Sequence, residues 1–369
     1  MPPKTLVCCA ASFSYGPASK LLVIAEAVGS LELRTVFLGT GIAHELAART
    51  FAFDEIVCAA PDDPLARSLV DAACALVSLM DREYLCLAQE RSKPTYVADS
   101  LFWMRDRTPA AFLRARRYWV QDFVGVPERV TETPSAPTVV GPIVRPMSPV
   151  SDTDRRNLVV SLGGCESPLS AISGDSSYFD FVVGGILRSD LVSAFKDQVV
   201  LMAGSRCIEY LAKRYPGSGI AFVSASPQEA ASLLETAAMV LTAPGLTTSL
   251  ECFQLAVPTF FLPPQNYSQW WILKKLRVKG VAGCSFHWED LLPGYPVGER
   301  MSEEVRVPLV RSAIQSLVRE ERAARAFGES LAGCLSCDRK AVASKQRDFF
   351  DSLGPNGVSR IVGDLAELC

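Results

Sequence analysis

Two kinds of residue pattern are scarce in this 369-residue sequence. It has only two histidines, and it has no long run of lysine or arginine in a chain of formal net charge −3. Nucleic-acid binding needs a basic surface, so we expect no nucleic-acid partner. No apolar run reaches the roughly 18 residues that span a bilayer, and no apolar signal region follows the N-terminus. We therefore expect a cytoplasmic protein without stable membrane insertion.

Sequence patterns for a resident metal ion are also sparse. The twelve cysteines are scattered, mostly in apolar or helical stretches, which is typical of reduced core residues. The one CxxC pair, Cys334 and Cys337, has no second pair or histidine at zinc-ligand spacing. We expect no metal site and no cofactor.

The first half of the chain alternates between short apolar runs and helical patterns. Residues 5–11 suit a buried parallel strand, a polar turn follows, and a helical pattern covers residues 18–30. Residues 34–38 form another apolar run, closed by Gly39-Thr40-Gly41. This order predicts a doubly wound α/β domain.

A carboxylate and two aromatic residues follow the strand predicted at residues 95–98. They are Asp99, Phe102 and Trp103. Parallel sheets bind ligands at the carboxyl ends of their strands, so these residues are candidates for a site. Alternatively, Asp99 caps a helix and both aromatic side chains belong to the core.

Residues 125–150 contain six prolines and include the sequence Val140-Gly-Pro-Ile-Val-Arg-Pro146. We interpret this segment as the last strand of a first domain running into a linker. The predicted division is an N-terminal Rossmann-like domain over residues 1–145, a second Rossmann-like domain over 146–338, and C-terminal helices over 339–369 that pack back across the lobes. One long amphipathic helix is expected over residues 303–328.

A second alternating series begins at residues 157–161, an apolar run that ends in Gly163 and Gly164. Two glycines at a strand end let the backbone approach a ligand closely, although a tight turn needs them equally. Further strands are predicted at residues 199–202, ending in Ala-Gly-Ser205, and at 220–223.

The next stretch, residues 239–262, has the pattern of a strand, a helix over residues 247–254 and another strand. Free backbone N–H groups and the helix dipole favour an anion at such a helix start, so a phosphate is expected at residues 245–248. Thr247 and Thr248 are expected to cap the helix, and Glu251 to accept hydrogen bonds from a ribose diol. The alternative is an ordinary βαβ unit without a ligand.

Three of these motifs resemble the donor-binding domain of a known enzyme family. They are "LVVSLGG" (158–164), "VLTAPGLTTSLE" (240–251) and "AVPTFFLPPQNYSQWWI" (256–272). They are similar to the two-Rossmann glycosyltransferases called GT-B, and in particular to those that add N-acetylglucosamine to lipid I. The segment "VGPIVRP" is similar to that family's interdomain segment. The likeness covers residues 140–290 and implies an α/β fold of two Rossmann-like domains that face each other across a cleft.

The resemblance implies a UDP-sugar as co-substrate and assigns roles to individual residues. Gly163 and Gly164 would face the diphosphate or the sugar, Phe222 would lie near the uracil and Gln269 near the donor sugar. The full donor-binding prediction comprises Gly163, Gly164, Ser205, Arg206, Phe222, Gly245, Thr247, Thr248, Glu251 and Gln269.

The chain departs from the family in two donor motifs and in its first loop. Ala243-Pro244 replaces a polar pair, and Gln269-Trp270 replaces tandem glutamines. Both changes put the donor sugar in doubt. Neither histidine, His44 or His287, has the loop position that many of these enzymes use for their base.

Inverting sugar transfer needs a group that takes the acceptor's proton, and Asp99 is our candidate for this catalytic base. The predicted acceptor-binding residues are Ser14, Tyr15, Gly16, Lys20, Phe102 and Trp103. The loops "ADSLFWMRD" and "FSYGPASKL" also look like those of the cytosylglucuronate synthases of nucleoside-antibiotic pathways. That narrower resemblance implies cytosine as acceptor and UDP-glucuronate as donor, with Arg206 or Lys20 meeting the donor carboxylate.

Three other hypotheses stay open at this point. The basic and aromatic stretch 101–117 permits docking to a membrane lipid acceptor. The same fold also serves UDP-sugar 2-epimerases, against which the scarcity of histidine argues. Finally, the Ala243-Pro244 departure is compatible with a non-catalytic protein that kept a degenerate donor site.

Overall fold

The computed structural model describes residues 3–133, 136–151, 155–163, 176–196, 198–292, 298 and 301–368. The chain divides into two compact units. The first comprises Met1–Pro146 and Leu353–Cys369, and the second comprises Met147–Ser352. The boundary predicted after residue 145 lies one residue away. The C-terminal segment is shared, because its last 17 residues belong to the first unit and the helix before them to the second.

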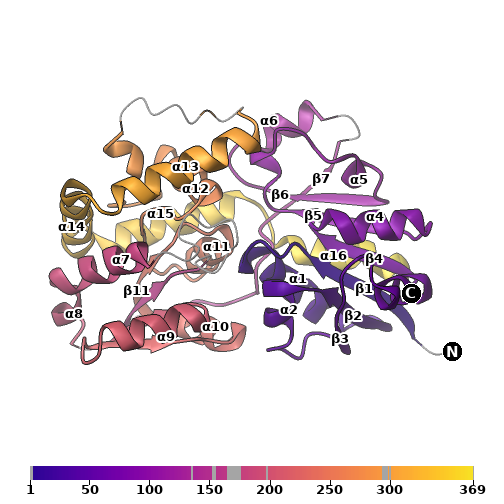
Figure 1. Cartoon of the computed structure of the whole chain (residues 1–369), viewed down its shortest axis with the longest axis horizontal. Coiled ribbons are helices and arrows are strands. Elements are labelled where there is room, and N and C mark those ends of the chain that lie inside the picture. The colour runs from indigo at the N-terminus through magenta and orange to yellow at the C-terminus, as the bar shows by residue number, and fades with distance from the viewer. Residues whose placement is uncertain are drawn as a thin grey trace. The chain divides into compact units, whose positions relative to one another are not determined.

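The first unit is built on a seven-stranded parallel sheet (Figure 1). Its order is β3-β2-β1-β4-β5-β6-β7, so the direction in which strands are added reverses between β1 and β4. The strands are β1 (Lys4–Ala10), β2 (Leu33–Gly39), β3 (Glu55–Cys58), β4 (Ala75–Leu79), β5 (Thr95–Asp99), β6 (Arg117–Gln121) and β7 (Thr138–Val140).

Helices from both ends of the chain cover this sheet. Buried side chains of α1, α2 and α16 share one apolar core with β1 and β4, while α4 packs on β4, α3 and α5. The helices are α1 (Tyr15–Val28), α2 (Gly41–Ala47), α3 (Pro64–Ala72), α4 (Arg82–Glu90), η1 (Phe102–Met104), α5 (Ala110–Leu113), α6 (Val126–Thr131), α16 (Gly357–Leu365) and η4 (Ala366–Leu368).

The segment predicted as a linker is held against the C-terminal segment of the chain. A Cβ atom at Gly141 would lie 1.9 Å from the carbonyl oxygen of Pro355, so only glycine fits there. The Gly357 N–H donates to Pro142 O at 2.9 Å, and Asn356 Nδ2 donates to Val144 O at 2.8 Å. Residues 141–144 are therefore a fixed part of the first unit.

The second unit contains a five-stranded parallel sheet of order β10-β9-β8-β11-β12. Its direction of strand addition reverses between β8 and β11. The strands are β8 (Asn157–Ser161), β9 (Val199–Met202), β10 (Ile220–Val223), β11 (Ala237–Thr242) and β12 (Thr259–Phe261), and the first three have the predicted bounds.

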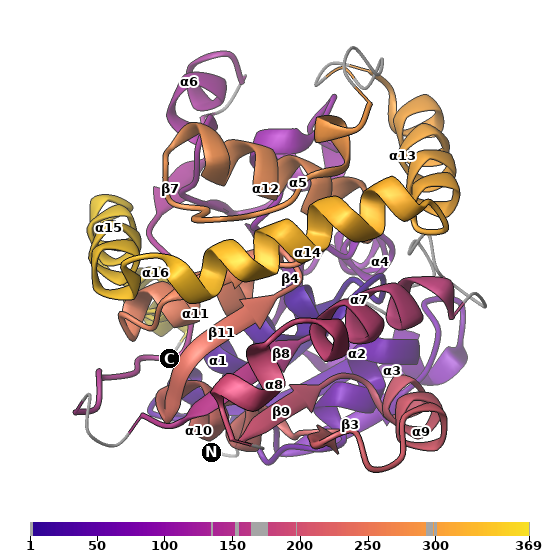
Figure 2. The same cartoon turned by 90° about the vertical axis from the view of Figure 1, so that its left-hand side faces the viewer.

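Ten helical segments accompany this sheet in the described residues. Side chains of α10 and α11 share an apolar core with β8 and β11. The helix α14 packs on α7 (Figure 2), and α15 packs on α11 and β12. The segments are α7 (Ser177–Arg188), α8 (Leu191–Ala194), α9 (Ser205–Arg214), α10 (Pro227–Glu235), α11 (Leu246–Gln254), α12 (Tyr267–Val278), η3 (Trp288–Asp290), α13 (Glu303–Leu317), α14 (Glu321–Ser336) and α15 (Arg339–Ser352).

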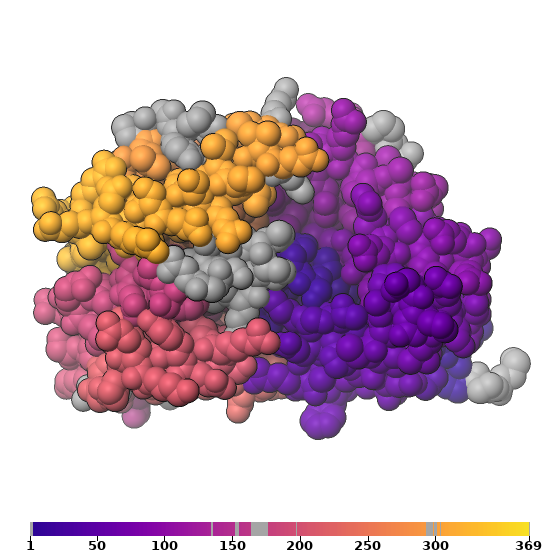
Figure 3. All heavy atoms as spheres, viewed as in Figure 1, coloured from indigo at the N-terminus to yellow at the C-terminus, as the bar shows by residue number. Residues whose placement is uncertain are grey.

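The prediction of one helix over residues 303–328 is wrong. The segment 303–336 forms α13 and α14, with a break at residues 318–320 where the backbone of Glu320 is extended (φ −90°, ψ 136°). Atoms of both helices lie on the surface of the second unit (orange and yellow in Figure 3). Among the described residues, no helix is long and apolar enough to cross a membrane.

Candidate functional site

The carboxyl edge of the second sheet carries the motifs on which the sequence interpretation rests. Ser161 of β8 pairs with Thr242 of β11, and the Ala243 N–H donates to Ser161 O at 2.8 Å. The loops that begin at Gly163 and Ala243 therefore leave the sheet side by side. They leave it at the reversal point between β8 and β11, where open α/β sheets bind ligands.

The helix α11 begins directly after this point without a side-chain cap. Its N-cap residue is Gly245 (φ −90°, ψ 131°), whose N–H donates to Ala243 O at 2.6 Å. The prediction that Thr247 and Thr248 cap the helix is wrong, because both lie inside its first turn. First-turn N–H groups have no acceptor within the helix, and here no side chain supplies one as a cap. The partly buried Glu251 follows one turn later.

Other predicted donor residues belong to loops and strands at the same edge. Ser205 and Arg206 are the exposed first residues of α9, which follows β9. Phe222 lies in β10 and is partly buried. Gly163 is exposed, whereas Gly164 lies outside the described residues.

The side chain of Gln269 makes hydrogen bonds within the protein that its predicted role near the donor sugar did not include. Its side chain is only 4% exposed. Its Oε1 accepts a hydrogen bond from the Gln265 N–H at 2.9 Å, and its Nε2 donates to Gly163 O at 3.1 Å. The side chain thus joins two loops at the carboxyl edge.

In the first unit, the predicted acceptor loop lies at the corresponding reversal point. Ser14 is the N-cap residue of α1 and makes no side-chain cap, and Tyr15 and Gly16 begin the helix. All three are partly buried. They follow β1, whose sheet neighbour on the other side of the reversal is β4. An uncapped helix start therefore occurs at the reversal point of each sheet.

Lys20, which was predicted to meet an acceptor or a phosphate, is an interior residue and is 1% exposed. Its Nζ donates to Gln121 Oε1 at 2.6 Å and to Ile143 O at 3.0 Å. A buried ammonium group needs such partners because the low dielectric penalises an unpaired charge. The ammonium thus ties α1 to the end of β6 and to the segment that follows β7.

Asp99 is completely buried, and both of its oxygens accept hydrogen bonds. Oδ2 accepts from Arg105 Nε at 2.5 Å and from Tyr118 Oη at 3.1 Å, while Oδ1 accepts from the Leu101 N–H at 2.9 Å. Burial, together with the adjacent Asp99 carboxylate, raises the pKa of Tyr118. Phe102 and Trp103 are 0% and 3% exposed, so both side chains lie in the core.

A second carboxylate at the carboxyl edge of the first sheet did not feature in the sequence interpretation. Asp81 follows β4, and its Oδ1 accepts from the N–H groups of Glu83 and Tyr84 at 3.0 and 3.2 Å. Burial raises the pKa of Asp81 above its usual range. Its sequence signal was an aspartate directly after the apolar run "ALVSLM". Asp81 lies at the β1/β4 reversal, beside which the acceptor loop begins.

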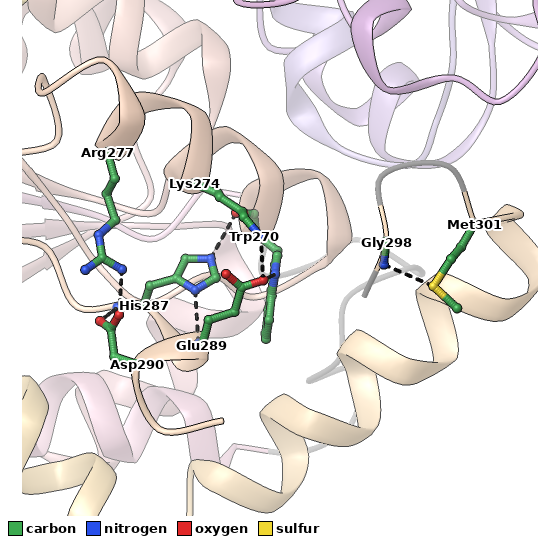
Figure 4. A network of polar contacts seen from close by, with 8 residues as sticks. All are labelled: Trp270, Lys274, Arg277, His287, Glu289, Asp290, Gly298 and Met301. Atoms are coloured by element: carbon green, nitrogen blue, oxygen red, sulfur yellow. Dashed lines mark hydrogen bonds and ion pairs between the residues drawn. The ribbon is translucent and has the colours of Figure 1, made fainter. Parts of the chain in front are cut away.

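His287 lies in a polar network of the second unit that Figure 4 shows from close by. Its Nδ1 accepts from the Glu289 N–H at 3.1 Å, so its Nε2 carries the hydrogen and donates to Trp270 O at 3.0 Å. Glu289 Oε1 accepts from Trp270 Nε1 and from Lys274 Nζ, both at 3.0 Å. His287 is 1% exposed and acts as the cap of η3, a structural role.

The neutral His287 ring makes stability depend on pH. Burial lowers the pKa of His287, although the Trp270 carbonyl and the Glu289 carboxylate oppose the shift. The unfolded chain then binds the proton more readily, so the stability from the neutral ring is present above about pH 6.5 and is lost as pH falls. We expect His287→Asn, which can still cap η3, to cost about 1–2 kcal/mol at pH 7.5.

Urea unfolding at pH 7.5, 6.5 and 5.5 measures this dependence. The difference between wild type and His287→Asn should shrink as pH falls, because only the wild type loses stability through this ring. His44→Asn serves as control, since His44 is partly exposed. A difference that stays constant over the three pH values would contradict the assignment.

Of the comparisons with known proteins, the one with solved structures gave matches. No family model matches the sequence, and no curated protein matches it. MurG of Acinetobacter baumannii is 14% identical with a TM-score of 0.50, over 100% of both chains. Os79 of O. sativa, solved in complex with UDP, is 11% identical with a TM-score of 0.53, over 98% of this chain and 99% of that one. The spinosyn rhamnosyltransferase SpnG is 12% identical with a TM-score of 0.53, over 98% and 100%.

At these identities the similarity establishes the fold. The chain consists of two parallel-sheet α/β domains and has the GT-B fold of glycosyltransferases, as predicted. In the described part of the chain, no group of three or more His, Cys, Asp or Glu side chains is placed to hold a metal ion.

Proposed function

We propose that the protein is a glycosyltransferase that moves a sugar from a UDP-sugar to a small acceptor. The observation that carries this proposal is the start of α11, which lies uncapped at the β8/β11 reversal with Glu251 one turn further on. The start suits a diphosphate and the carboxylate suits a ribose diol. The GT-B fold, shared with Os79 solved with UDP, supports the same ligand class.

The proposed mechanism is an inverting displacement. The acceptor atom attacks the anomeric carbon of the donor while the bond to the UDP oxygen breaks. The first-turn N–H groups of α11 stabilise the charge that develops on the departing diphosphate, a role that needs no metal ion. A carboxylate at the carboxyl edge of the first sheet, Asp99 or Asp81, takes the proton of the acceptor.

We favour a small acceptor over a membrane lipid because of where the aromatic residues lie. A docking surface in the stretch 101–117, which the sequence permits, would depend on four of its apolar side chains. All are buried: Phe102, Trp103, Met104 and Phe112 are 0%, 3%, 8% and 1% exposed. Insertion into a lipid surface needs exposed apolar side chains, which these four do not provide.

The narrower proposal keeps cytosine or another nucleobase as acceptor and UDP-glucuronate as donor. Lys20 and Arg206 were both candidates for the donor carboxylate. Lys20 is buried in the first unit, whereas Arg206 is exposed at the start of α9. Arg206 is therefore the residue we assign to that carboxylate. A 2-epimerase is disfavoured because His287, one of only two histidines, is engaged as a helix cap.

Titration calorimetry with UDP tests the proposal directly. We expect binding with a dissociation constant of about 1 μM to 1 mM, the range typical of enzyme substrates. Mass spectrometry should then detect transfer from one of a panel of UDP-sugars to cytosine, another nucleobase or a lipid acceptor. Turnover of UDP-N-acetylglucosamine without acceptor would indicate an epimerase instead. Absence of UDP binding by the folded protein would refute the proposal.

A further inference from the structure

Three cysteines of the second unit lie close together at the C-terminal end of α14. Cys284 belongs to the loop between α12 and η3, whereas Cys334 and Cys337 form the CxxC pair of the sequence. The Cys334 thiol donates to Cys284 O at 3.6 Å, and the Cys337 thiol donates to Cys334 O at 3.5 Å. All three are free thiols, and the proposed sugar transfer gives none of them a role.

The helix α14 approaches Cys284 at a glycine. A Cβ atom at Gly333 would lie 3.1 Å from Cys284 Cβ and 3.2 Å from its Sγ, so the Cys284 side chain lies directly against the helix backbone. Cys337 comes one turn after Gly333, and its N–H donates to Gly333 O at 3.0 Å. Residues four apart are neighbours on a helix surface. Cys337 therefore lies on the side that Cys284 contacts, and the two side chains are within hydrogen-bonding reach of each other.

The backbone around Cys284 is held in place by two helices. Cys284 O accepts a hydrogen bond from Ser330 Oγ of α14. Val281 O, three residues earlier, accepts from Gln346 Nε2 of α15 at 2.9 Å. Cys284 therefore stays beside Cys337 unless these bonds break.

The three thiols differ in access to solvent and in acidity. Cys284 and Cys337 are partly exposed, whereas Cys334 is 1% exposed. Burial and the neighbouring Cys284 sulfur raise the pKa values of Cys334 and Cys337, so both keep their protons at neutral pH. The thiolate is the form that reacts with a disulfide. Among these three, Cys284 is therefore the thiol that we expect to meet a dissolved oxidant first.

We propose that Cys284 and Cys337 form a reversible disulfide, so that this end of α14 is an oxidative modification site. The co-reactant is a low-molecular-weight disulfide, such as glutathione disulfide. The Cys284 thiolate attacks one of its sulfur atoms and releases one glutathione, and the Cys337 sulfur then attacks Cys284 Sγ and releases the second. The two electrons and two protons of the protein thiols end on the two glutathione molecules.

The disulfide has a physical consequence for the second unit. It cross-links the ends of a segment of about 50 residues, which contains η3, α13 and α14. Closing a loop of this length lowers the entropy of the unfolded chain and so stabilises the folded one. The second unit is then more stable in oxidising than in reducing solution, whether or not the chain binds a UDP-sugar.

The test is oxidation of the whole chain with glutathione disulfide, followed by alkylation, trypsin digestion and mass spectrometry. We expect the peptide that contains Cys284 to be joined to the peptide that contains Cys337. The Tm of the oxidised protein should lie about 5–10 °C above that of the reduced protein. Dithiothreitol should reverse both changes.

Variants identify the partner, because Cys334 and Cys337 share one tryptic peptide. Cys334→Ala keeps both proposed partners and should retain the cross-link and the Tm shift. Cys284→Ser and Cys337→Ser should each lose both. The control is Cys58→Ser, which removes an exposed thiol of the first unit and should behave as the wild type.

Each other outcome overturns the inference. A cross-link that disappears in Cys334→Ala would show that Cys334 is the partner. Glutathione bound to Cys284 without any cross-link would show that Cys337 does not close the bond. A wild type in which all three thiols are alkylated after oxidation would show that no disulfide forms, and this result does not depend on the folding of any variant.

Discussion

We expect the free energy of unfolding of the Asp99→Asn variant to be about 3 kcal/mol lower than that of the wild type. Removing one partner of a buried ion pair costs about 3–5 kcal/mol, and the lower end applies here because Arg105 keeps 19% exposure of its side chain. The substitution removes the carboxylate charge that pairs with the Arg105 guanidinium and weakens the acceptor of Tyr118 Oη. Urea unfolding followed by tryptophan fluorescence measures the loss.

A double-mutant cycle tests the physical reason. Arg105→Gln removes the other partner, so the double variant Asp99→Asn/Arg105→Gln should be much less destabilised than the two single losses added together. Additive losses would contradict an energetic role for the ion pair. They would also mean that the ion pair with Arg105 does not offset the free-energy cost of burying the Asp99 carboxylate.

The Asp99→Asn variant, together with Asp81→Asn, tests which carboxylate acts as the base. Loss of a general base lowers kcat by roughly 10²–10⁴-fold in protein that remains folded. Among the described residues, the Asp99 carboxylate accepts four hydrogen bonds, two of them from Arg105, whereas that of Asp81 accepts two, both through Oδ1. We therefore compare kcat of Asp99→Asn and Asp81→Asn below their unfolding temperatures. A large kcat loss in Asp99→Asn alone would identify Asp99 as the base, and a large loss in Asp81→Asn alone would identify Asp81.

The strands of the second sheet show what the sequence can predict. β8, β9 and β10 have the predicted bounds. β8 and β9 are mostly buried, and buried strands of a parallel sheet are short, continuous apolar runs. The order of these runs along the chain also predicts the Rossmann-like alternation. Such local signals were sufficient for the fold.

Among the elements that were not predicted, β4 and α12 were missed for different reasons. β4 lies in an apolar stretch next to a helix, and a short apolar run cannot be assigned to strand or helix by periodicity alone. No helix was predicted at α12, whose N-cap and first residues are "NYSQ". An asparagine three residues before a glutamine is a helix-start signal, and Asn266 does cap the helix, so this element was within reach of prediction.

The hydrogen-bond partners of the site side chains could not be predicted from the sequence. Lys20 is engaged by Gln121, 101 positions away, and Gln269 by Gly163, 106 positions away. No local pattern encodes such pairings. The sequence could place a lysine and a glutamine near strand ends, but only the packed structure shows that both side chains are used internally. Among the described residues, it also shows a buried amide without hydrogen-bond partners, that of Gln265.

Glu251→Ala is expected to raise the dissociation constant of UDP by about 100-fold. Two hydrogen bonds from ribose hydroxyls to a carboxylate contribute about 3 kcal/mol together, which corresponds to two decades in affinity. If the carboxylate binds the diol, the wild type should prefer UDP to 2′-deoxy-UDP by about tenfold, and Glu251→Ala should lose this preference. Calorimetry with both nucleotides measures it, with Glu329→Gln, an exposed carboxylate on α14, as control. A variant that still discriminates between the two nucleotides would place the ribose elsewhere.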